Sequence, residues 1–216
     1  MNKINGIIFD MDGVLVDSEP VIEAAARAGL AEYGIKAVPE DFHPFVGAGE
    51  DRYIGGVAEK YGVPFKLEMK ARVYEIYLEM VDKEIGIYEG IPELLAELRR
   101  MGYKLALASS ADRIKVDANL KAAKIDPSVF EVLLSGSDVE RKKPFPDIYL
   151  KACEGLGIDP SNALIIEDAV NGVQAAKAAG CYCCGITSSF SAEALRAEGA
   201  DFIKSETPSI IELLKG

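Results

Sequence analysis

Three aspartates lie in and directly after an apolar run near the start of the chain. The stretch "INGIIFDMDGVLVDS", residues 4–18, holds Asp10, Asp12 and Asp17. A buried carboxylate is costly unless a cation or hydrogen-bond donors pair with it. Acids spaced two residues apart after a buried strand therefore indicate a function for the carboxylates. The candidates are nucleophilic attack, proton transfer and the binding of a hard cation.

Polar groups also follow later apolar runs. Ser109 and Ser110 end "LALASS", Lys143 lies in "RKKPFPD", and Glu167 and Asp168 follow "NALII". In a parallel α/β sheet, ligands bind at the carboxyl ends of the strands, where the strand order reverses. Any one of these residues could simply cap the following helix. Their convergence with the first acid pair predicts one polar site.

The combined chemistry of these groups favours a phosphate ester as ligand. Asp10 and Asp168 could hold Mg²⁺, which prefers one or two carboxylates plus water. Lys143, a serine hydroxyl and the backbone N–H groups of Met11 and Asp12 could hold the phosphoryl oxygens. The metal and the lysine would also offset the repulsion between a phosphate and several acids.

A carboxylate is the available nucleophile, because no His, Cys or Ser beside a base is evident and His43 is the only histidine. Asp10 would then form an aspartyl phosphate. Asp12 could protonate the leaving alkoxide and later take a proton from the attacking water, since one carboxyl group can serve both steps in sequence. Gly13 permits a tight turn directly after the acids.

These groups must be positioned by a parallel sheet. From Gly102 onward, the strand-like runs "YKLALASS", "FEVLLSG", "NALIIED" and "CYCCGIT" alternate with amphipathic helical segments. Short apolar runs separated by helices are typical of βαβ units. The run "NGIIFD" is apolar on both sides and predicts the first strand of the same sheet. The fold class we expect is α/β, a doubly wound parallel sheet.

Residues 18–87 show a different pattern. Three helical segments, "EPVIEAAARAGLAEYG", "EDRYIGGVAEKYG" and "KLEMKARVYEIYLEMVDKE", follow one another with no convincing strand between them. We therefore expect an α/β core of residues 1–17 and 88–216, and an inserted all-helical cap of residues 18–87. Asp17 and the following "SEP" suit a helix start and a hinge between the two parts.

The cap contains one glycine-flanked turn, "GAGED" at residues 47–51. Gly47, Ala48 and Gly49 could form a loop that enters the site and reads the substrate, with Glu50 and Arg52 as its polar groups. The alternative is an ordinary turn between helices, because glycine supplies turns in many contexts.

The amino-acid composition and net charge of the chain exclude some classes of binding partner. The chain has 216 residues, is 49% hydrophobic and carries a net charge of −11. Its pI is near 4.7, so nucleic acid and anionic membrane surfaces are poor partners. We find neither a signal peptide nor a membrane span and expect a monomeric cytoplasmic protein. The four cysteines lack zinc-site spacing, and we expect reduced core thiols.

Four short segments resemble the motifs of the haloacid-dehalogenase superfamily, in their usual order: "DMDGVLVDS", Ser109 ending "LALASS", Lys143 in "KKPFPD", and "IEDAVNGVQAAKAAG". Together they cover essentially the whole chain. The helical insert after the first motif resembles the small cap of the subgroup that includes β-phosphoglucomutases and sugar-phosphate phosphatases. The segment "ASSADRIKVDANLKAA" also resembles the haloacid-dehalogenase-like domain of the plant protein called suppressor of quenching.

The resemblance implies a Rossmann-like core and a role for each motif residue. Asp10 would be the nucleophile and Asp12 the acid/base. Mg²⁺ would be held by the Asp10 side chain, the Asp12 backbone carbonyl and Asp168, with Glu167 as a further acidic ligand, direct or through water. True dehalogenases lack the second aspartate, so halide displacement is disfavoured. The residues expected around the phosphoryl group are Ser109, Ser110, Lys143 and Met11.

The departures from the family pattern concern the cap. β-Phosphoglucomutases carry a histidine where this chain has Ile22, and an arginine where it has Glu50, the nearest arginine being Arg52. A cap lysine of that group aligns roughly with Val73, and a core asparagine with Arg113. Because the groups that clamp a second phosphate are mostly missing, we favour a hydrolase over a mutase.

The function we expect is therefore a Mg²⁺-dependent phosphatase of a small phosphorylated metabolite, a sugar phosphate, with phospho-Asp10 as intermediate. A phosphomutase of the β-phosphoglucomutase type is the alternative. A phospho-receiver-like signalling module is more remote, because a receiver needs neither the helical insert nor the Asp-x-Asp spacing.

Overall fold

The computed structural model describes residues 3–214, and its centre is a parallel β-sheet. The strand order is β5-β4-β1-β6-β7-β8, and every pair of neighbours runs parallel. This confirms the expected fold class, and adds a strand that the sequence pattern missed, the short β8. The strands are β1 (Gly6–Phe9), β4 (Lys104–Ala108), β5 (Val132–Leu134), β6 (Ala163–Glu167), β7 (Tyr182–Ile186) and β8 (Phe202–Lys204).

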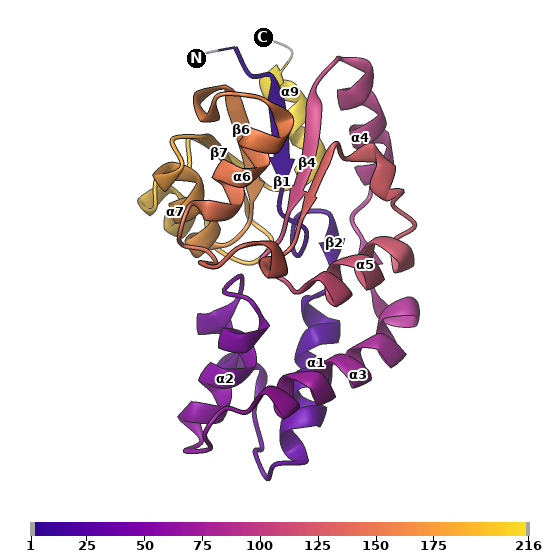
Figure 1. Ribbon diagram of the computed structural model, residues 1–216, viewed down its shortest axis with the longest axis vertical. Helices are drawn as coiled ribbons and strands as arrows, with labels where there is room; N and C mark the ends of the chain where they lie inside the picture. Colours follow the sequence, from indigo (N-terminus) through magenta and orange to yellow (C-terminus); the bar gives the residue numbers. More distant parts are fainter. Residues whose placement is uncertain (1–2, 215–216) are drawn as a thin grey trace.

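Helices cover both faces of this sheet (Figure 1). Successive residues of β1 point to opposite faces, so that Ile7 and Phe9 join one apolar cluster and Ile8 joins the other. Both sides of β1 are thus buried, as the continuous apolar run predicts. On the face of Ile7 lie α4 (Ile91–Arg100), α5 (Arg113–Ala122) and α9 (Ile211–Leu214), and on the face of Ile8 lie α6 (Asp147–Leu156), α7 (Val170–Ala178) and α8 (Ala192–Ala197).

The cap is helical and has an apolar core of its own. It is formed by α1 (Glu19–Ala31), α2 (Glu50–Lys60) and α3 (Leu67–Glu84), with two short 3₁₀ turns, Pro39–Asp41 and His43–Phe45, between α1 and α2. Apolar side chains from all three helices pack together, among them Ile22, Ile54 and Tyr77, each at most 2% exposed. The cap lies beyond the carboxyl ends of the core strands (Figure 1), and can therefore close over whatever binds there.

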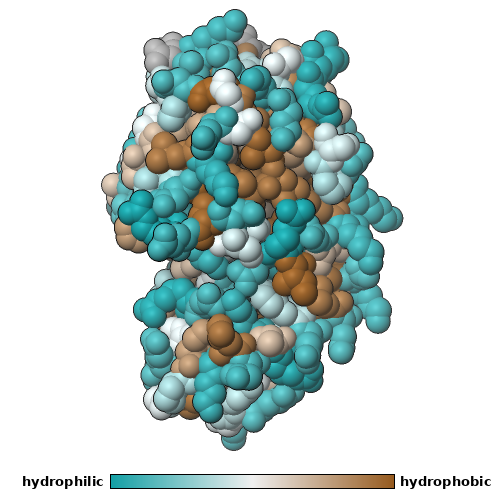
Figure 2. Space-filling model, viewed as in Figure 1, coloured by the Kyte–Doolittle hydropathy of each residue, from teal (hydrophilic) through white to brown (hydrophobic). Residues whose placement is uncertain are grey.

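Two features join the cap to the core. The strands β2 (Val16–Asp17) and β3 (Gly86–Ile87) pair antiparallel, so the chain enters and leaves the cap through neighbouring strands. Helix α5 of the core packs against α3 of the cap through Ala118 and Ala122. Elsewhere a narrow waist separates the two lobes on the face seen in Figure 2.

The cysteines confirm the expectation of reduced core thiols. Cys153 on α6 and Cys181, Cys183 and Cys184 at β7 are all free and buried. Among residues 3–214, no helix is both long and apolar enough to cross a membrane.

Candidate active site

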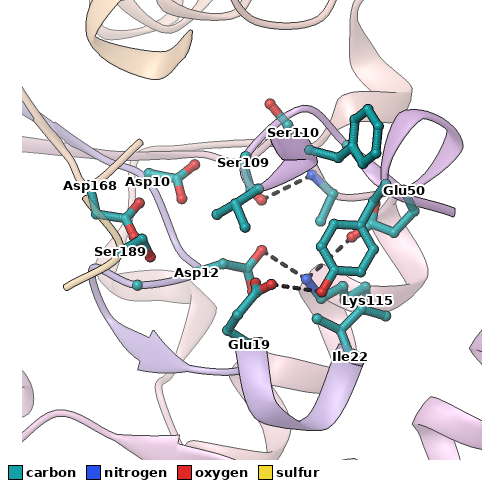
Figure 3. A pocket seen from close by; sticks show the side chains of 17 residues that line it. Asp10, Asp12, Glu19, Ile22, Glu50, Ser109, Ser110, Lys115, Asp168 and Ser189 are labelled. Atoms are coloured by element: carbon teal, nitrogen blue, oxygen red, sulfur yellow. Dashed lines mark hydrogen bonds and ion pairs between the residues drawn. The ribbon is translucent and has the colours of Figure 1, made fainter. Parts of the chain in front are cut away.

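The sheet brings the strand-end residues of separate segments to one cavity. Asp10 follows β1, Ser109 follows β4 and Asp168 follows β6, and these strands are neighbours in the sheet. All three side chains line the same small cavity of about 40 Å³ between core and cap, together with Asp12 and Ser110 (Figure 3). The site thus lies at the carboxyl ends of the strands where the sheet divides into two halves, β1, β4 and β5 on one side and β6, β7 and β8 on the other, as expected for an open α/β fold.

Lys143 is held in a buried cluster of charges. Its ammonium lies 2.6 Å from Oδ1 of Asp10 and 2.5 Å from Oε1 of Glu167, and the residue is only 4% exposed. Burial nevertheless raises the pKa of Asp10 to about 7, although the attraction of Lys143 opposes that rise. The structure therefore places Lys143, the expected phosphoryl-binding lysine, beside the first aspartate.

Glu167 occupies a different position from the one expected of a metal ligand. Its Oε1 also accepts a hydrogen bond from the Tyr149 hydroxyl (3.0 Å), and its Oε2 accepts from the backbone N–H groups of Asp168 and Ala169. Gly172 lies so close that a Cβ there would be 1.8 Å from Oε1. Both oxygens are thus engaged by the protein, so this carboxylate holds Lys143 rather than facing the cavity.

Asp12 is held by donors that the sequence reasoning missed. The Lys115 ammonium lies 3.0 Å from its Oδ2, and the Asn119 side-chain amide donates to its Oδ1 at 3.1 Å. The Ser18 hydroxyl also donates to Oδ1. Lys115 is 3% exposed, and although burial opposes its charge, the attraction of the nearby acids sets its pKa well above the ordinary value. Arg113, the expected residue on this helix, is exposed and pairs with Asp117 instead.

Asp168 faces the loop that carries the first acids. The hydroxyls of Ser188 and Ser189, which the sequence reasoning also missed, donate to its Oδ2. Gly13 has a φ of +74°, and a Cβ there would lie 1.8 Å from the same oxygen. The tight turn expected at Gly13 is confirmed, and its absence of a side chain also makes room for the carboxylate.

One buried hydroxyl suits a phosphoryl oxygen. Ser110 is 6% exposed, and its Oγ has no hydrogen-bond partner within the described chain. The neighbouring Ser109 Oγ accepts a bond from the Ala111 N–H at 3.1 Å. An unpaired buried hydroxyl is costly, so a ligand oxygen would relieve that cost. The Met11 side chain packs in the apolar core, so only its backbone could contact a ligand.

The oxygen ligands at this site suit Mg²⁺, although no cluster of three acidic side chains surrounds a metal position in the described residues. No three His, Cys, Asp or Glu side chains in residues 3–214 converge as a ready metal site, but Mg²⁺ needs only one or two carboxylates beside water. Of the ligands that the family resemblance implies, the Asp10 and Asp168 carboxylates line the cavity. Burial raises the pKa of Asp168 well above its ordinary value, and the nearby acids Glu167 and Asp10 add to that rise. A cation would offset this repulsion.

The cap loop at residues 47–49 docks directly on the core. A Cβ on Gly47 would lie 2.7 Å from Ala169 Cβ, and one on Gly49 would lie 3.0 Å from the Ser110 carbonyl oxygen. Gly47 and Gly49 line the cavity, whereas Ala48 lines an outer pocket of the same loop. Both glycines have positive φ, of +76° and +83°.

The two polar residues expected from this loop point in different directions. Glu50 lines the cavity, 4% exposed, with its Oε1 3.2 Å from the Lys115 ammonium. Arg52 instead lies outside the cavity, where it pairs with Glu59 at 3.2 Å and covers the Phe45 ring. The structure therefore brings Glu50 into the site and leaves Arg52 out.

Comparisons with known proteins give the family. A family model for haloacid dehalogenase-like hydrolases matches residues 7–186. The chain is 42% identical over 212 residues to protein suppressor of quenching 1, chloroplastic, of Arabidopsis thaliana, a match that covers 96% of this chain and 20% of that protein. The chain thus spans only one fifth of the length of this relative.

Two further relatives match over most of both chains. The phosphorylated carbohydrates phosphatase of Thermotoga maritima is 34% identical over 187 residues, or 82% of each protein. The crystal structure of CbbY from Rhodobacter sphaeroides in complex with phosphate aligns with a TM-score of 0.82 at 27% identity, over 96% of each chain. The chain therefore belongs to the haloacid dehalogenase-like hydrolases, and it is an enzyme that hydrolyses phosphoric monoesters.

Proposed function

We propose that this enzyme is a Mg²⁺-dependent phosphatase of a small sugar phosphate, and that the reaction passes through a phosphorylated Asp10. The observation that carries the proposal is the meeting of Asp10, Asp12, Ser110 and Asp168 at one cavity, with Lys143 bound to Asp10. The name of the Thermotoga maritima relative, a phosphatase of phosphorylated carbohydrates, supports the class of substrate.

In the first step, the Asp10 carboxylate attacks phosphorus and the ester P–O bond breaks. Lys143 binds Oδ1 of Asp10, which leaves Oδ2 as the attacking atom. The leaving alkoxide oxygen takes a proton from the carboxylic acid of Asp12, which then becomes a carboxylate. Lys115 and Asn119 keep Asp12 in place as it changes charge.

In the second step, water attacks the phosphorus of phospho-Asp10. The Asp12 carboxylate takes a proton from that water, the acyl phosphate P–O bond breaks, and inorganic phosphate and free Asp10 result. Ser109, Ser110 and the backbone N–H groups after Asp10 would hold the phosphoryl oxygens. Mg²⁺, held by Asp10, Asp168 and the Asp12 carbonyl, would supply positive charge beside those oxygens.

Phosphate release from a panel of phosphomonoesters tests the proposal. The purified protein should release inorganic phosphate with Mg²⁺ and lose this activity when EDTA is added. The Asp10→Asn variant should be inactive. Asp82→Asn, the same change at an exposed cap residue, is the matched control and should keep the activity. Full activity of the Asp10→Asn variant would show that the mechanism is wrong.

The phosphomutase alternative makes a different prediction for the products. A mutase would interconvert β-glucose 1-phosphate and glucose 6-phosphate when a catalytic amount of bisphosphate is present, with little phosphate release. Phosphorus NMR of the reaction mixture separates the two reactions, because a phosphatase yields inorganic phosphate as the main product.

A further inference from the structure

The cavity has two chemically different ends (Figure 3). Asp10, Asp168 and Ser189 lie together at the end where the phosphoryl group would bind. Glu19, Glu50, Lys115 and Ile22 lie at the other end, and Asp12 lies between the two groups. Because Asp12 would protonate the leaving oxygen, the second group faces the part of the substrate that leaves.

Lys115 is the only basic residue among those that line the cavity in the described part of the chain. Its ammonium is already engaged on two sides, 3.0 Å from Oδ2 of Asp12 and 3.2 Å from Oε1 of Glu50. Of its three N–H donors, two are thus taken by carboxylates, and the Tyr77 ring lies over the ammonium with its centroid at 5.8 Å. A second anionic group on the substrate would therefore compete with these carboxylates for the lysine. Displacing Asp12 would remove the proton carrier from its place.

The cap adds negative charge to this end, and its nearby cations are already paired. Arg52 turns outward to Glu59, and the Lys70 ammonium lies 2.6 Å from Asp51 and 2.8 Å from Asp112. A phosphate or carboxylate on the leaving group would therefore meet acids rather than a cationic clamp, and like charges placed together in a water-poor site disfavour binding strongly.

Neutral hydroxyl groups of a substrate can bind to the residues that line this end of the cavity. Glu50 and Glu19 are acceptors, and each carboxylate offers several lone-pair sites. Oε1 of Glu19 accepts the Tyr53 hydroxyl at 2.7 Å, which fixes its direction, and Ile22 adds an apolar surface. Substrate hydroxyls can donate to these carboxylates without adding charge.

We propose that the Glu50–Lys115 ion pair selects phosphomonoesters whose leaving group is uncharged and rich in hydroxyls, and rejects those that carry a second phosphate or a carboxylate. This inference rests on the proposed phosphatase function. Glu50, which the cap brings into the cavity, is the specificity-determining residue. It pairs with Lys115, the one cation of the described cavity lining to which a second anion could bind.

Matched substrate pairs test this selection in the presence of Mg²⁺. Glucose 6-phosphate is compared with 6-phosphogluconate, glycerol 3-phosphate with 3-phosphoglycerate, and ribose 5-phosphate with ribose 1,5-bisphosphate. The wild-type enzyme should prefer the member with the uncharged leaving group by roughly tenfold or more in kcat/KM in each pair that it hydrolyses. This comparison needs no variant, so it does not depend on whether a variant folds.

A variant then assigns the preference to Glu50. Glu50→Gln frees the Lys115 ammonium on one side, and should shrink the preference by about tenfold, mainly by raising kcat/KM for the anionic member. Glu59→Gln, the same change at an exposed site on the same helix, should leave the ratio as in the wild type.

The outcomes separate this inference from the proposed function. Equal or better hydrolysis of the anionic members by the wild type, with Asp10→Asn inactive on every substrate, would overturn the selection and leave the phosphatase in place. An unchanged ratio in Glu50→Gln would overturn the role of that residue. Activity that survives Asp10→Asn would overturn the proposed function itself.

Discussion

Asp12, the proton carrier of the proposed reaction, is fixed by three side chains from two places in the chain. Lys115 and Asn119 reach it from α5, and Ser18 reaches it from the start of the cap. Asn119 is itself held by the hydroxyl of Tyr77 on α3, at 2.5 Å. The position of this carboxylate thus depends on contacts that form only when core and cap are packed together.

Replacing Asp12 should separate the two chemical steps. In Asp12→Asn, we expect kcat for an alkyl phosphate to fall by about 10²–10⁴-fold, because both proton transfers lose their acid/base. With p-nitrophenyl phosphate, the leaving group needs no proton, so a burst of p-nitrophenolate equal to the enzyme concentration should precede slow turnover. Stopped-flow absorbance measures the burst, and Asp117→Asn, at an exposed site, is the control. Slow turnover without a burst would contradict this role.

The pKa of Asp10 predicts a pH-dependent affinity for Mg²⁺. Burial raises that pKa to about 7, so at pH 6 the carboxyl group is largely protonated before the cation binds. Cation binding must then release a proton, because only the carboxylate is a good ligand. The affinity should therefore rise as the pH increases through about 7, and the raised pKa of Asp168 extends this dependence.

Titration calorimetry of the Mg²⁺ affinity across this range checks the prediction. Buffers with different ionisation enthalpies report the released protons directly. An affinity that stays constant from pH 5.5 to 8 would show that Asp10 is already ionised throughout.

At the scale of elements, α5 explains why part of the site escaped the sequence reasoning. Lys115 and Asn119 are four residues apart and share one helix face, but a lysine in an amphipathic helix usually indicates a solvated position. The same helix presents Ala118 and Ala122 to the cap, and these small residues allow the close approach that buries Lys115. The spacing was visible in the sequence, whereas the neighbouring cap helix was not.

The strand-end residues could be predicted because their chemistry follows from the strand pattern alone. Asp10 and Ser109 directly follow buried apolar runs, and Asp168 follows one after Glu167. Parallel strands bring such positions to one edge. Ser188 and Ser189 also follow a strand, β7, but two serines after "CYCCGIT" are equally typical of a surface turn. Their approach to Asp168 depends on the turn geometry, which no pattern in the sequence indicated.

The cap loop predicts a contrast between two glycines. Gly49 has a φ of +83° and lies against the core, whereas Gly62, also in the cap, has a φ of +73° and open space where a Cβ would lie, with nothing within 4 Å. Alanine should destabilise both turns by about 1 kcal/mol through backbone strain. Only Gly49→Ala also obstructs docking of the loop.

We therefore expect similar losses of thermal stability in Gly49→Ala and Gly62→Ala, measured by calorimetry. The value of kcat/KM should fall by roughly tenfold or more in Gly49→Ala alone, because a contact misplaced by about 1 Å disturbs reacting groups strongly. Equal kcat/KM in the two variants would show that the loop does not need to dock for catalysis.

For the whole molecule, the alternation of apolar runs and helices predicted the sheet and the helical insert. The strands that the sequence pattern missed are too short to show a periodic pattern. β8 has three residues, and β2 and β3 have two each. In such short segments, pairing with a neighbouring strand decides the structure, and sequence periodicity has no length in which to appear.

Closure of the cap over the core should depend on salt. Lys70 of α3 lies 2.8 Å from Asp112, which directly precedes α5, and Lys142 of the core lies 3.1 Å from the same carboxylate. A partly exposed pair of this kind contributes about 0.2–1 kcal/mol and is screened by salt. Lys70→Met should therefore lower kcat/KM by a few-fold, and added NaCl should affect the variant less than the wild type.

Steady-state kinetics across a range of NaCl concentrations measures this effect. Lys204→Met, which removes an ion pair with Glu212 at the far edge of the core sheet, is the control and should keep the salt dependence of the wild type. If Lys70→Met has the same salt dependence as the wild type, the Lys70–Asp112 ion pair does not contribute to closure of the cap.

The pairing of β2 with β3 makes the cap, in topological terms, one very long hairpin loop. The chain leaves the core at Val16 and returns at Ile87, which is the direct partner of Val16. Whatever lies between these two residues can be lengthened, shortened or exchanged without changing the strand order of the core. An exchanged cap must, however, keep Ser18 and Tyr77, because these two residues of the loop help to hold the proposed proton carrier Asp12, directly and through Asn119.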